Sequence, residues 1–338
     1  MPILLHAIRR LVLTCATLYG SVVVVLSLLW AAGPQHVWWV ALSNIFAPYA
    51  FLPLLVLVPA AMLLRSRWLT GWLAVLLLLF GVLFGSQLLP RAPQREAATL
   101  RVVTFNQLFN NKRTADVIAA IRAQNADVVA LQELSDSVAA AAQQQLHDEY
   151  PYQLLQPADQ PSGLGVLSRY PFDVHPVAPD ARYQKVVLHA GGTAITVLNV
   201  HPHVPRVQFR ESHITRPWQQ GGGYDTSTRT QELDGVLNEM YQTAGAILVV
   251  GDFNLSDREP MYQLFSARMH DAFRETNWGF GFTFPNHGHF GPVELPFPLV
   301  RIDYVWSAGG MLPVATNVNC NDVGSDHCML VADMTLRS

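Results

Sequence analysis

The sequence has few lysines, few cysteines and no acidic residue near its start. Only Lys112 and Lys185 are lysines among 22 basic residues. Binding of a nucleic acid duplex draws on dense Lys and Arg contacts to phosphates, and this composition offers few of them. The three cysteines, Cys15, Cys320 and Cys328, are not spaced as a metal-binding motif. All 25 acidic residues follow position 90, so the start of the chain differs in kind from the rest.

That acid-free region contains three long apolar runs. The runs cover residues 8–30, 37–64 and 68–89. Each is long enough to cross a bilayer as a helix, and three prolines predict kinks in the second. We therefore expect residues 1–90 to be a membrane anchor with three transmembrane helices. A cleaved signal peptide accounts for the first run alone, and a buried helical hairpin of a soluble protein is the other alternative.

Arginines at the ends of these runs predict the orientation of a multi-pass membrane protein. Arg9 and Arg10 begin the first run, and Arg65 and Arg67 lie between the second and third. Because positive loops stay inside, the N-terminus is expected in the cytoplasm and the remainder of the chain outside it. Two further arginines, at positions 91 and 95, argue weakly in the opposite direction.

The remainder of the chain reads as one acidic soluble domain behind a short linker. From Arg91 onward there are 18 basic and 25 acidic residues, a formal charge of −7. Residues 91–99 are polar, include a proline and lack a period, which is typical of a linker. We expect residues 100–338 to form the functional domain.

Polar side chains follow several buried strands of that domain. Ala246 to Val250 is an apolar run, and Asp252 and Asn254 follow it two apart, on one side if the segment is extended. The other reading is a strand ending in an Asx turn. Asn106 follows a strand over 100–105, and Glu133 follows one over 127–131.

The second half of the domain repeats this pattern. A hairpin with strands 183–189 and 194–200 around Gly191-Gly192 delivers Asn199 and His201. Asp303 lies in a strand over 301–306, and Ser325-Asp326-His327 precedes a strand over 328–336.

Helices are expected between these strands. Thr114 is expected to cap a helix that runs to about Gln124, and Ser135 to cap a helix over 136–147. Two more are expected over 227–242 and 259–267.

The motifs T-F-N, L-Q-E-L, N-V-H, G-D-F-N, R-I-D-Y and S-D-H, in this order between Leu100 and Leu336, resemble the signature of the endonuclease/exonuclease/phosphatase superfamily. These metal-dependent phosphoesterases include DNase I-like nucleases and neutral sphingomyelinases. The resemblance implies an α/β fold, a four-layered α/β sandwich in which two mixed sheets pack face to face and are covered by helices. It says nothing about the first ninety residues.

The same resemblance implies a role for each site residue. Asp252 would activate water, and Asn254 would bond the phosphoryl oxygens. Glu133 and Asn106 would hold Mg²⁺ or Mn²⁺, with Asp326 towards the metal. Further roles are implied for His201 and His327 in stabilising the transition state, for Asp303 in orienting His327, and for Arg229 on the phosphate side. Some members carry an acid two residues after the Asn, where this chain has Leu108.

Three functions agree with these features. A metal-dependent phosphodiesterase acting on a phospholipid or sphingolipid headgroup explains the anchor, the negative charge and an aromatic segment over 273–298 that is suited to a membrane surface. The alternatives are an extracytoplasmic, membrane-tethered nuclease and a non-catalytic membrane scaffold. The sequence leaves three points open. They are the oligomeric state, the choice between a lid and disorder for residues 204–226, and the pairing of Cys320 with Cys328.

Overall fold

The computed structural model describes residues 2–91, 97–207, 223–290 and 293–337. It divides into two compact units. The first comprises Met1–Leu89 together with Arg206–Asp225, and the second comprises Pro90–Pro205 together with Thr226–Ser338. Most of the predicted linker, residues 92–96, and most of the predicted lid, residues 208–222, lie outside the described residues.

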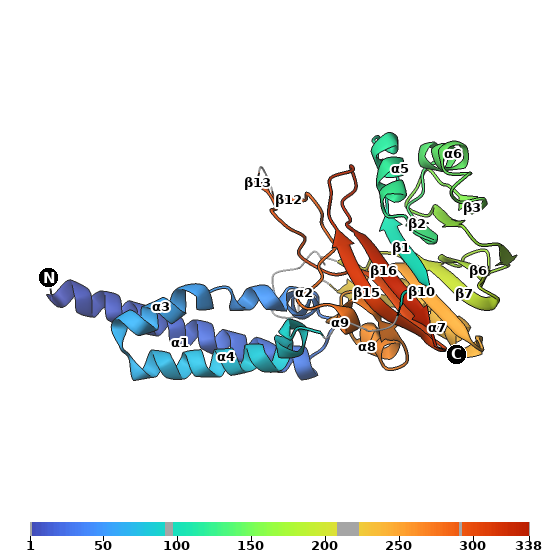
Figure 1. Cartoon of the computed structure of the whole chain (residues 1–338). Coiled ribbons are helices and arrows are strands. Elements are labelled where there is room, and N and C mark those ends of the chain that lie inside the picture. The colour runs from blue at the N-terminus through green and yellow to red at the C-terminus, as the bar shows by residue number, and fades with distance from the viewer. Residues whose placement is uncertain (1, 92–96, 208–222, 291–292, 338) are drawn as a thin grey trace, which may run out of the picture. The chain divides into compact units, whose positions relative to one another are not determined.

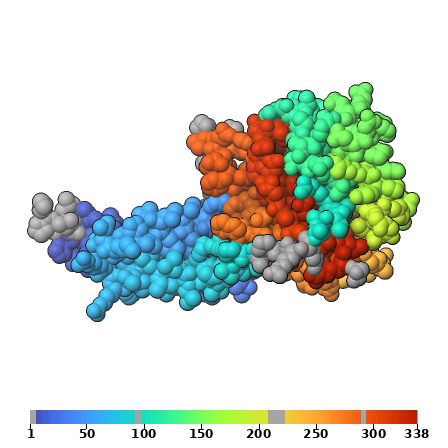
Figure 2. All heavy atoms as spheres, viewed as in Figure 1, coloured from blue at the N-terminus to red at the C-terminus, as the bar shows by residue number. Residues whose placement is uncertain are grey.

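The first unit is helical. Its elements are α1 (Pro2–Ala32), α2 (Trp38–Ile45), η1 (Ala47–Phe51), α3 (Leu54–Leu64), α4 (Arg67–Leu88) and the short strands β8 (Arg206–Val207) and β9 (Tyr224–Asp225). Three stretches, His6–Ala32, Ala47–Leu64 and Arg67–Leu88, are long and apolar enough to cross a membrane. Large apolar side chains such as Leu55 and Leu63 are exposed on this unit, where a lipid would cover them. The helices of this unit are the blue to cyan part of Figure 2.

The second of these stretches is shorter than the predicted span over 37–64. Pro48 lies in the first turn of η1 and Pro53 is the N-cap residue of α3, so this part of the chain consists of three short helices. Proline lacks a backbone N–H and cannot continue the helix that precedes it. Of these three prolines, Pro59 is the one that lies beyond the first turn of a helix.

Helices α1 and α4 pack closely at a glycine. A β-carbon on Gly20 would lie 2.3 Å from the Trp72 ring, so that position has no room for a side chain. The Trp68 indole N–H donates to Thr17 Oγ1 at 2.8 Å.

The second unit contains two six-stranded sheets packed face to face (Figure 1). The first sheet, in spatial order, is β15 (Met311–Asn319), β16 (Met329–Leu336), β1 (Leu100–Asn106), β2 (Val128–Gln132), β4 (Leu164–Ser168) and β3 (Tyr152–Gln156). The second is β11 (His270–Asp271), β14 (Asp303–Ala308), β10 (Ala246–Asp252), β7 (Thr193–Val200), β6 (Tyr183–Ala190) and β5 (Phe172–His175). A separate hairpin joins β12 (His289–Phe290) to β13 (Val293–Glu294).

Helices cover both outer faces. They are α5 (Thr114–Ala123) and α6 (Asp136–Gln145) on the first sheet, and α7 (Ser227–Gln242) and α8 (Pro260–Ser266) on the second. The short α9 (Ala272–Thr276) instead adds Ala272 and Phe273 to the core between the sheets. Apolar side chains from both sheets, including Val102, Val197 and Leu248, form the core between them. Each sheet has one parallel pair, β1 with β2 and β7 with β10, among antiparallel ones. The predicted four-layered α/β sandwich with mixed sheets is confirmed.

Local expectations were met at most elements. The Gly191-Gly192 turn has positive φ at both residues and joins β6 to β7 as predicted. Ser135 caps α6 by accepting from Val138 N–H. The prediction for Thr114 was wrong, because the helix begins at this residue and Arg113 is its N-cap without a side-chain cap.

The chain end carries one covalent link and one shortened strand. Cys320 and Cys328 form a disulfide, which answers the question that the sequence left open. The strand expected over 301–306 begins at Asp303. Arg301 lies before it, and its buried guanidinium forms a two-point ion pair with Asp271 at 2.7 and 2.8 Å.

Candidate active site

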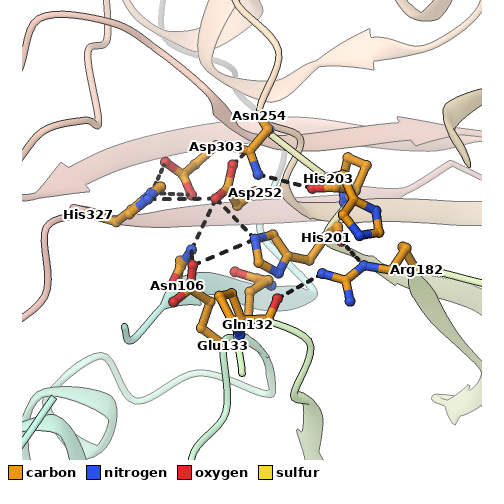
Figure 3. Close-up of polar contacts among 12 residues, drawn as sticks. Asn106, Gln132, Glu133, Arg182, His201, His203, Asp252, Asn254, Asp303 and His327 are labelled. Atoms are coloured by element: carbon orange, nitrogen blue, oxygen red, sulfur yellow. Dashed lines mark hydrogen bonds and ion pairs between the residues drawn. The ribbon is translucent and has the colours of Figure 1, made fainter. Parts of the chain in front are cut away.

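The predicted site residues come together where strands of the two sheets end side by side (Figure 3). Asn106 ends β1 and Asp252 ends β10, and the Asn106 amide donates to Asp252 Oδ2 at 3.0 Å. This contact joins the two sheets directly. Asn106 Nδ2 also lies 3.2 Å from Glu133 Oε1, just beyond the end of β2. Three polar side chains that are far apart in sequence therefore share one hydrogen-bonded cluster.

Glu133 is held by its own backbone and by its neighbours. Its φ of 54° is left-handed, which turns the chain sharply out of β2. Its Oε2 accepts from Phe109 N–H at 3.1 Å, and its carbonyl accepts from the Gln107 side chain. The carboxylate is thus fixed before any ligand binds.

The turn after β10 depends on glycine. A β-carbon on Gly251, where φ is +147°, would lie 1.9 Å from the Val200 carbonyl oxygen. Asn254 has a φ of 47° and its N–H donates to Asp252 Oδ1 at 2.8 Å, which is an Asx turn. The strand has already ended, so strand alternation is not what aligns Asp252 with Asn254. The turn brings them together, and Asn254 Nδ2 donates to the Pro202 carbonyl at 3.0 Å.

Two buried imidazoles flank Asp252. His201 Nε2 and His327 Nε2 each lie 3.6 Å from Asp252 Oδ2, and His201 Nε2 lies 3.8 Å from Glu133 Oε1. His327 Nδ1 lies 3.0 Å from Asp303 Oδ2. Asp303 on β14 is opposite Asp252 on the neighbouring antiparallel strand β10. Asp303 is therefore placed to orient the His327 ring, as the resemblance implies.

These surroundings give the two histidines different charges. Burial lowers the pKa of His201 to about 4, although the Asp252 carboxylate opposes this shift. Burial also lowers the pKa of His327, but the carboxylates of Asp303 and Asp252 outweigh it and raise the pKa to about 10. Burial, with Asp303 adding to it, raises the pKa of Asp252. At neutral pH the site holds an imidazolium and a neutral imidazole on either side of one carboxylate.

The Ser325-Asp326-His327 segment is tied to the first sheet. Ser325 Oγ donates to the Asn106 carbonyl at 2.6 Å and accepts from His327 N–H at 3.0 Å. Asp326 Oδ1 is buried without a hydrogen-bond partner among the described residues. Burial raises the pKa of Asp326, and the nearby Glu133 raises it further.

The side chains on this edge fit a hard divalent cation. Asn106, Glu133 and Asp326 offer amide and carboxylate oxygens, and the partnerless buried Asp326 Oδ1 lacks what a cation would supply. A second group, Asp252, Asp303 and His327, has ligand atoms within 4.8 Å of one another. There the ring nitrogens of a charged His327 face two carboxylates, so they have no lone pair for a metal.

Arg229 does not lie at an open surface. Its side chain is 3% exposed, and its guanidinium donates to the Glu259 carboxylate and to the Asn254 carbonyl. The geometry thus gives no support to the expected substrate contact of Arg229, because the donors of its guanidinium bond other groups of the protein. It instead holds the turn that carries Asn254.

Sequence reasoning gave no role to two groups beside the site. Gln132 Nε2 donates to Asn199 Oδ1 at 2.7 Å, and Asn199 Nδ2 donates to the Leu131 carbonyl, so this pair links the sheets underneath the site. Alternation along the strand predicts that Asn199 and His201 share a side, but the strand ends at Val200. The second group is Arg182 with His203. Arg182 lies in the loop before β6, where no period marks it.

Comparison with known proteins agrees with this geometry. The family model described as "Endonuclease/Exonuclease/phosphatase family" matches residues 103–327. An endonuclease/exonuclease/phosphatase from Bacteroides vulgatus is similar, with 18% identity, a TM-score of 0.53, and 70% of this chain and 99% of that chain covered. Humanized D. rerio TDP2 is similar, with 16% identity, a TM-score of 0.52, and 70% and 98% covered.

D. rerio TDP2 complexed with a single-strand DNA product is also similar, with 15% identity, a TM-score of 0.50, and 70% of this chain and 98% of that chain covered. No protein with a curated functional description matches significantly. At these identities the solved structures show a shared fold. The family model covers most of the chain, and the chain therefore belongs to the endonuclease/exonuclease/phosphatase family.

Proposed function

We propose that this protein is a membrane-anchored, divalent-metal-dependent phosphodiesterase whose substrate is a phospholipid or sphingolipid headgroup. The observation that carries the proposal is the position of Asp252, 1% exposed, between two imidazoles of different charge and hydrogen-bonded to Asn106 beside Glu133. A surface turn needs none of these contacts. Family membership supplies the reaction class, hydrolysis of a phosphoester.

The side chains divide the work of hydrolysis. Asp252, whose raised pKa makes it a stronger base, takes a proton from the attacking water as the new P–O bond forms and the P–O bond to the leaving alcohol breaks. The leaving oxygen takes a proton from solvent, and Asp252 then returns its proton to solvent. Asn254 and the His327 imidazolium donate hydrogen bonds to the phosphoryl oxygens, where charge develops. Asp303 keeps the His327 ring oriented and charged. His201, neutral and buried, lies beside both carboxylates and packs at the phosphate position.

Asn106, Glu133 and Asp326 are the residues proposed to hold Mg²⁺ or Mn²⁺. When bound, the cation neutralises charge on the phosphoryl group. Its binding would also relieve the repulsion between Glu133 and Asp326, which raises the pKa of Asp326.

A lipid substrate is supported by charge and by surface aromatics. The chain from Arg91 onward is acidic and contains only two lysines. In the predicted aromatic segment, Trp278 is 63% exposed and Phe297 is 54% exposed, whereas Phe273 is buried. The rings of Phe280 and Phe282 stack at 5.1 Å and are partly exposed. Exposed aromatics of this kind are suited to a lipid interface.

A tethered nuclease is the second candidate, supported by the fold shared with a TDP2 that was complexed with single-strand DNA product. Assays of the full chain in detergent separate the two. One set uses vesicles of phosphatidylglycerol, phosphatidylethanolamine or sphingomyelin, and the other uses single- and double-stranded DNA. Faster hydrolysis of DNA than of every lipid would overturn the lipid proposal.

Replacing Glu133 tests the metal site. Glu133→Gln should lower hydrolysis at least about 100-fold with an unchanged melting temperature, because it removes an anionic ligand at constant volume. Activity should disappear in EDTA and return with Mg²⁺ or Mn²⁺. Glu149→Gln, which breaks a surface ion pair with Arg122, is the matched control. Full activity of the wild type in chelator would refute metal dependence.

A further inference from the structure

Arg182 lies beside the catalytic cluster with unused donors. Its Nε–H donates to the His201 carbonyl at 3.1 Å, and its Nη2 donates to the Pro161 carbonyl at 2.7 Å. Among the described residues, Nη1 has no hydrogen-bond partner, and the side chain is partly exposed. A guanidinium has five N–H donors, so most of the fork remains available. The two carbonyl contacts fix the position of the Arg182 guanidinium without neutralising its positive charge.

His203 is the second residue on this side of the cluster, and Glu232 holds it in place. Its Nδ1 lies 2.5 Å from Glu232 Oε1, and its backbone N–H donates to Glu232 Oε2 at 2.8 Å. The carboxylate accepts a hydrogen bond from Nδ1–H, so the ring is oriented with Nε2 facing away from Glu232. The His203 side chain is 50% exposed, whereas that of Glu232 is only 14% exposed.

This pair differs from the other histidine–carboxylate pairs on the surface. The carboxylates that face His189, His270 and His287 are 71%, 41% and 57% exposed, and each makes a single contact with its imidazole. Glu232 is mostly buried and holds both the ring and the backbone of His203. Such a two-point support fixes a side chain more firmly than an exposed ion pair does.

Both side chains adjoin the reacting centre on the side of His201 that is away from His327 (Figure 3). Arg182 is bonded to the carbonyl of His201, and Pro202, whose carbonyl holds Asn254, leads directly to His203. Glu232 lies close enough to Arg182 to influence its charge. Burial lowers the pKa of Arg182 despite Glu232 and Glu133, as expected for a cation that lacks sufficient counter-charge.

We infer that Arg182 and His203 form a subsite for a second anionic group of the substrate, next to the phosphodiester that is cleaved. The inference rests on the proposed function and narrows its substrate class. A lipid whose headgroup ends in a phosphate would complete the guanidinium fork, since a planar fork matches phosphate oxygens. A headgroup that ends in a quaternary ammonium would place a cation against Arg182.

Three short-chain lipids that differ beyond the cleaved diester test the subsite. They are dihexanoyl phosphatidylcholine, phosphatidylglycerol and phosphatidylglycerol phosphate, each assayed with the full chain in detergent and Mg²⁺. The wild type should give the highest kcat/KM on the lipid with a terminal phosphate. Arg182→Gln should lower kcat/KM about tenfold on that lipid, through a higher KM, and less than about twofold on phosphatidylcholine. His203→Gln should also lower kcat/KM more on the lipid with a terminal phosphate than on phosphatidylcholine.

Matched variants distinguish binding from structural support. Arg122→Gln and His189→Gln break surface pairs of the same types and should leave all three activities unchanged. Arg182→Lys should recover part of the loss, because it keeps the charge. Equal losses for Arg182→Gln on all three lipids, or a wild type that does not discriminate between them, would overturn the subsite.

A binding measurement separates this inference from the proposed function. If the wild type hydrolyses none of the lipids, the proposed function fails. Calorimetric titration with glycerol 3-phosphate still measures anion binding at Arg182 and His203. Arg182→Gln should bind it about tenfold more weakly than the wild type. Equal affinities would refute the subsite, whatever the lipid assays show.

Discussion

His201 and His327 are the same residue type at equal distances from Asp252, yet their surroundings leave His201 neutral and His327 positively charged. Both Nε2 atoms lie 3.6 Å from Asp252 Oδ2. The difference comes from the other ring nitrogen, because His327 Nδ1 faces the Asp303 carboxylate while His201 Nδ1 is buried without a partner among the described residues. A single second carboxylate therefore decides which ring is the charged donor.

Asp303→Asn tests this at the scale of one residue. The amide cannot balance the imidazolium, so kcat should fall about 100-fold while KM changes little. Nitrogen NMR should show the His327 ring changing from the charged form to a neutral tautomer. Asp116→Asn, on an exposed pair with Arg113, serves as the control. A kcat within twofold of the wild type would rule out the orienting role of Asp303.

The sequence predicted most of these site residues because each follows an apolar strand at the edge where strands of the two sheets end. Asn106, Glu133, His201 and Asp252 are of this kind. Arg182 was not predictable in the same way, since its position depends on the carbonyls of His201 and Pro161, which only the folded chain brings together. The internal contacts of Arg229 were not predictable for a similar reason, because its partners Glu259 and Asn254 follow it by 30 and 25 residues.

Among the elements, the loop from Cys320 to Cys328 has the greatest effect on the site. It carries Asp326 and His327 and has almost no regular structure. Its supports are the disulfide, an Asn111 Nδ2 bond to the Val323 carbonyl at 3.0 Å, and an Arg113–Asp322 ion pair at 2.8 Å. The ion pair is exposed and therefore weak, so the loop near His327 is constrained by the disulfide together with the buried Ser325 Oγ bond to the Asn106 carbonyl.

Removing the disulfide should loosen this loop. Cys320→Ser with Cys328→Ser should lower the free energy of unfolding by about 2.5 kcal/mol, from the loop-closure entropy alone, and should reduce kcat. Dithiothreitol should have the same effect on the wild type. Cys15→Ser removes the free cysteine of α1 and should change neither quantity. Unchanged kcat and unchanged stability in the double variant would show that the bridge is dispensable.

Element boundaries were less predictable than element types. The hairpin over 183–200 was predictable because two glycines with positive φ fix its turn. In the second apolar run the prolines predicted kinks, but the continuous hydropathy over 37–64 did not show that Pro48 and Pro53 separate three helices, α2, η1 and α3. The order of strands in each sheet depends on long-range pairing, such as β1 with β16, which no local pattern encodes.

Over the whole molecule, charge is divided between an apolar helical region without acids and an acidic remainder. The first ninety residues contain four arginines and no Asp or Glu, and the rest carries a formal charge of −7. The three stretches that are able to cross a membrane all lie within the first part. If all three cross, the N-terminus and the family domain lie on opposite sides of the bilayer. Orientation therefore decides which substrates the site meets.

We predict that the family domain lies outside the cytoplasm. The opposite orientation would carry Arg65 and Arg67, which lie between α3 and α4, across the bilayer, where translocation of positive loops is disfavoured. An extracytoplasmic position also provides the oxidising setting in which the Cys320–Cys328 bridge persists. An alkaline phosphatase fused after Ser338 should be active, and a fluorescent protein that folds only in the cytoplasm should be dark at the same position. Changing Arg65 and Arg67 to Gln should weaken this preference, whereas changing Arg91 should strengthen it. A bright fluorescent fusion with an inactive phosphatase fusion would place the site among cytoplasmic nucleotides and nucleic acids, and would favour the nuclease over the lipid phosphodiesterase.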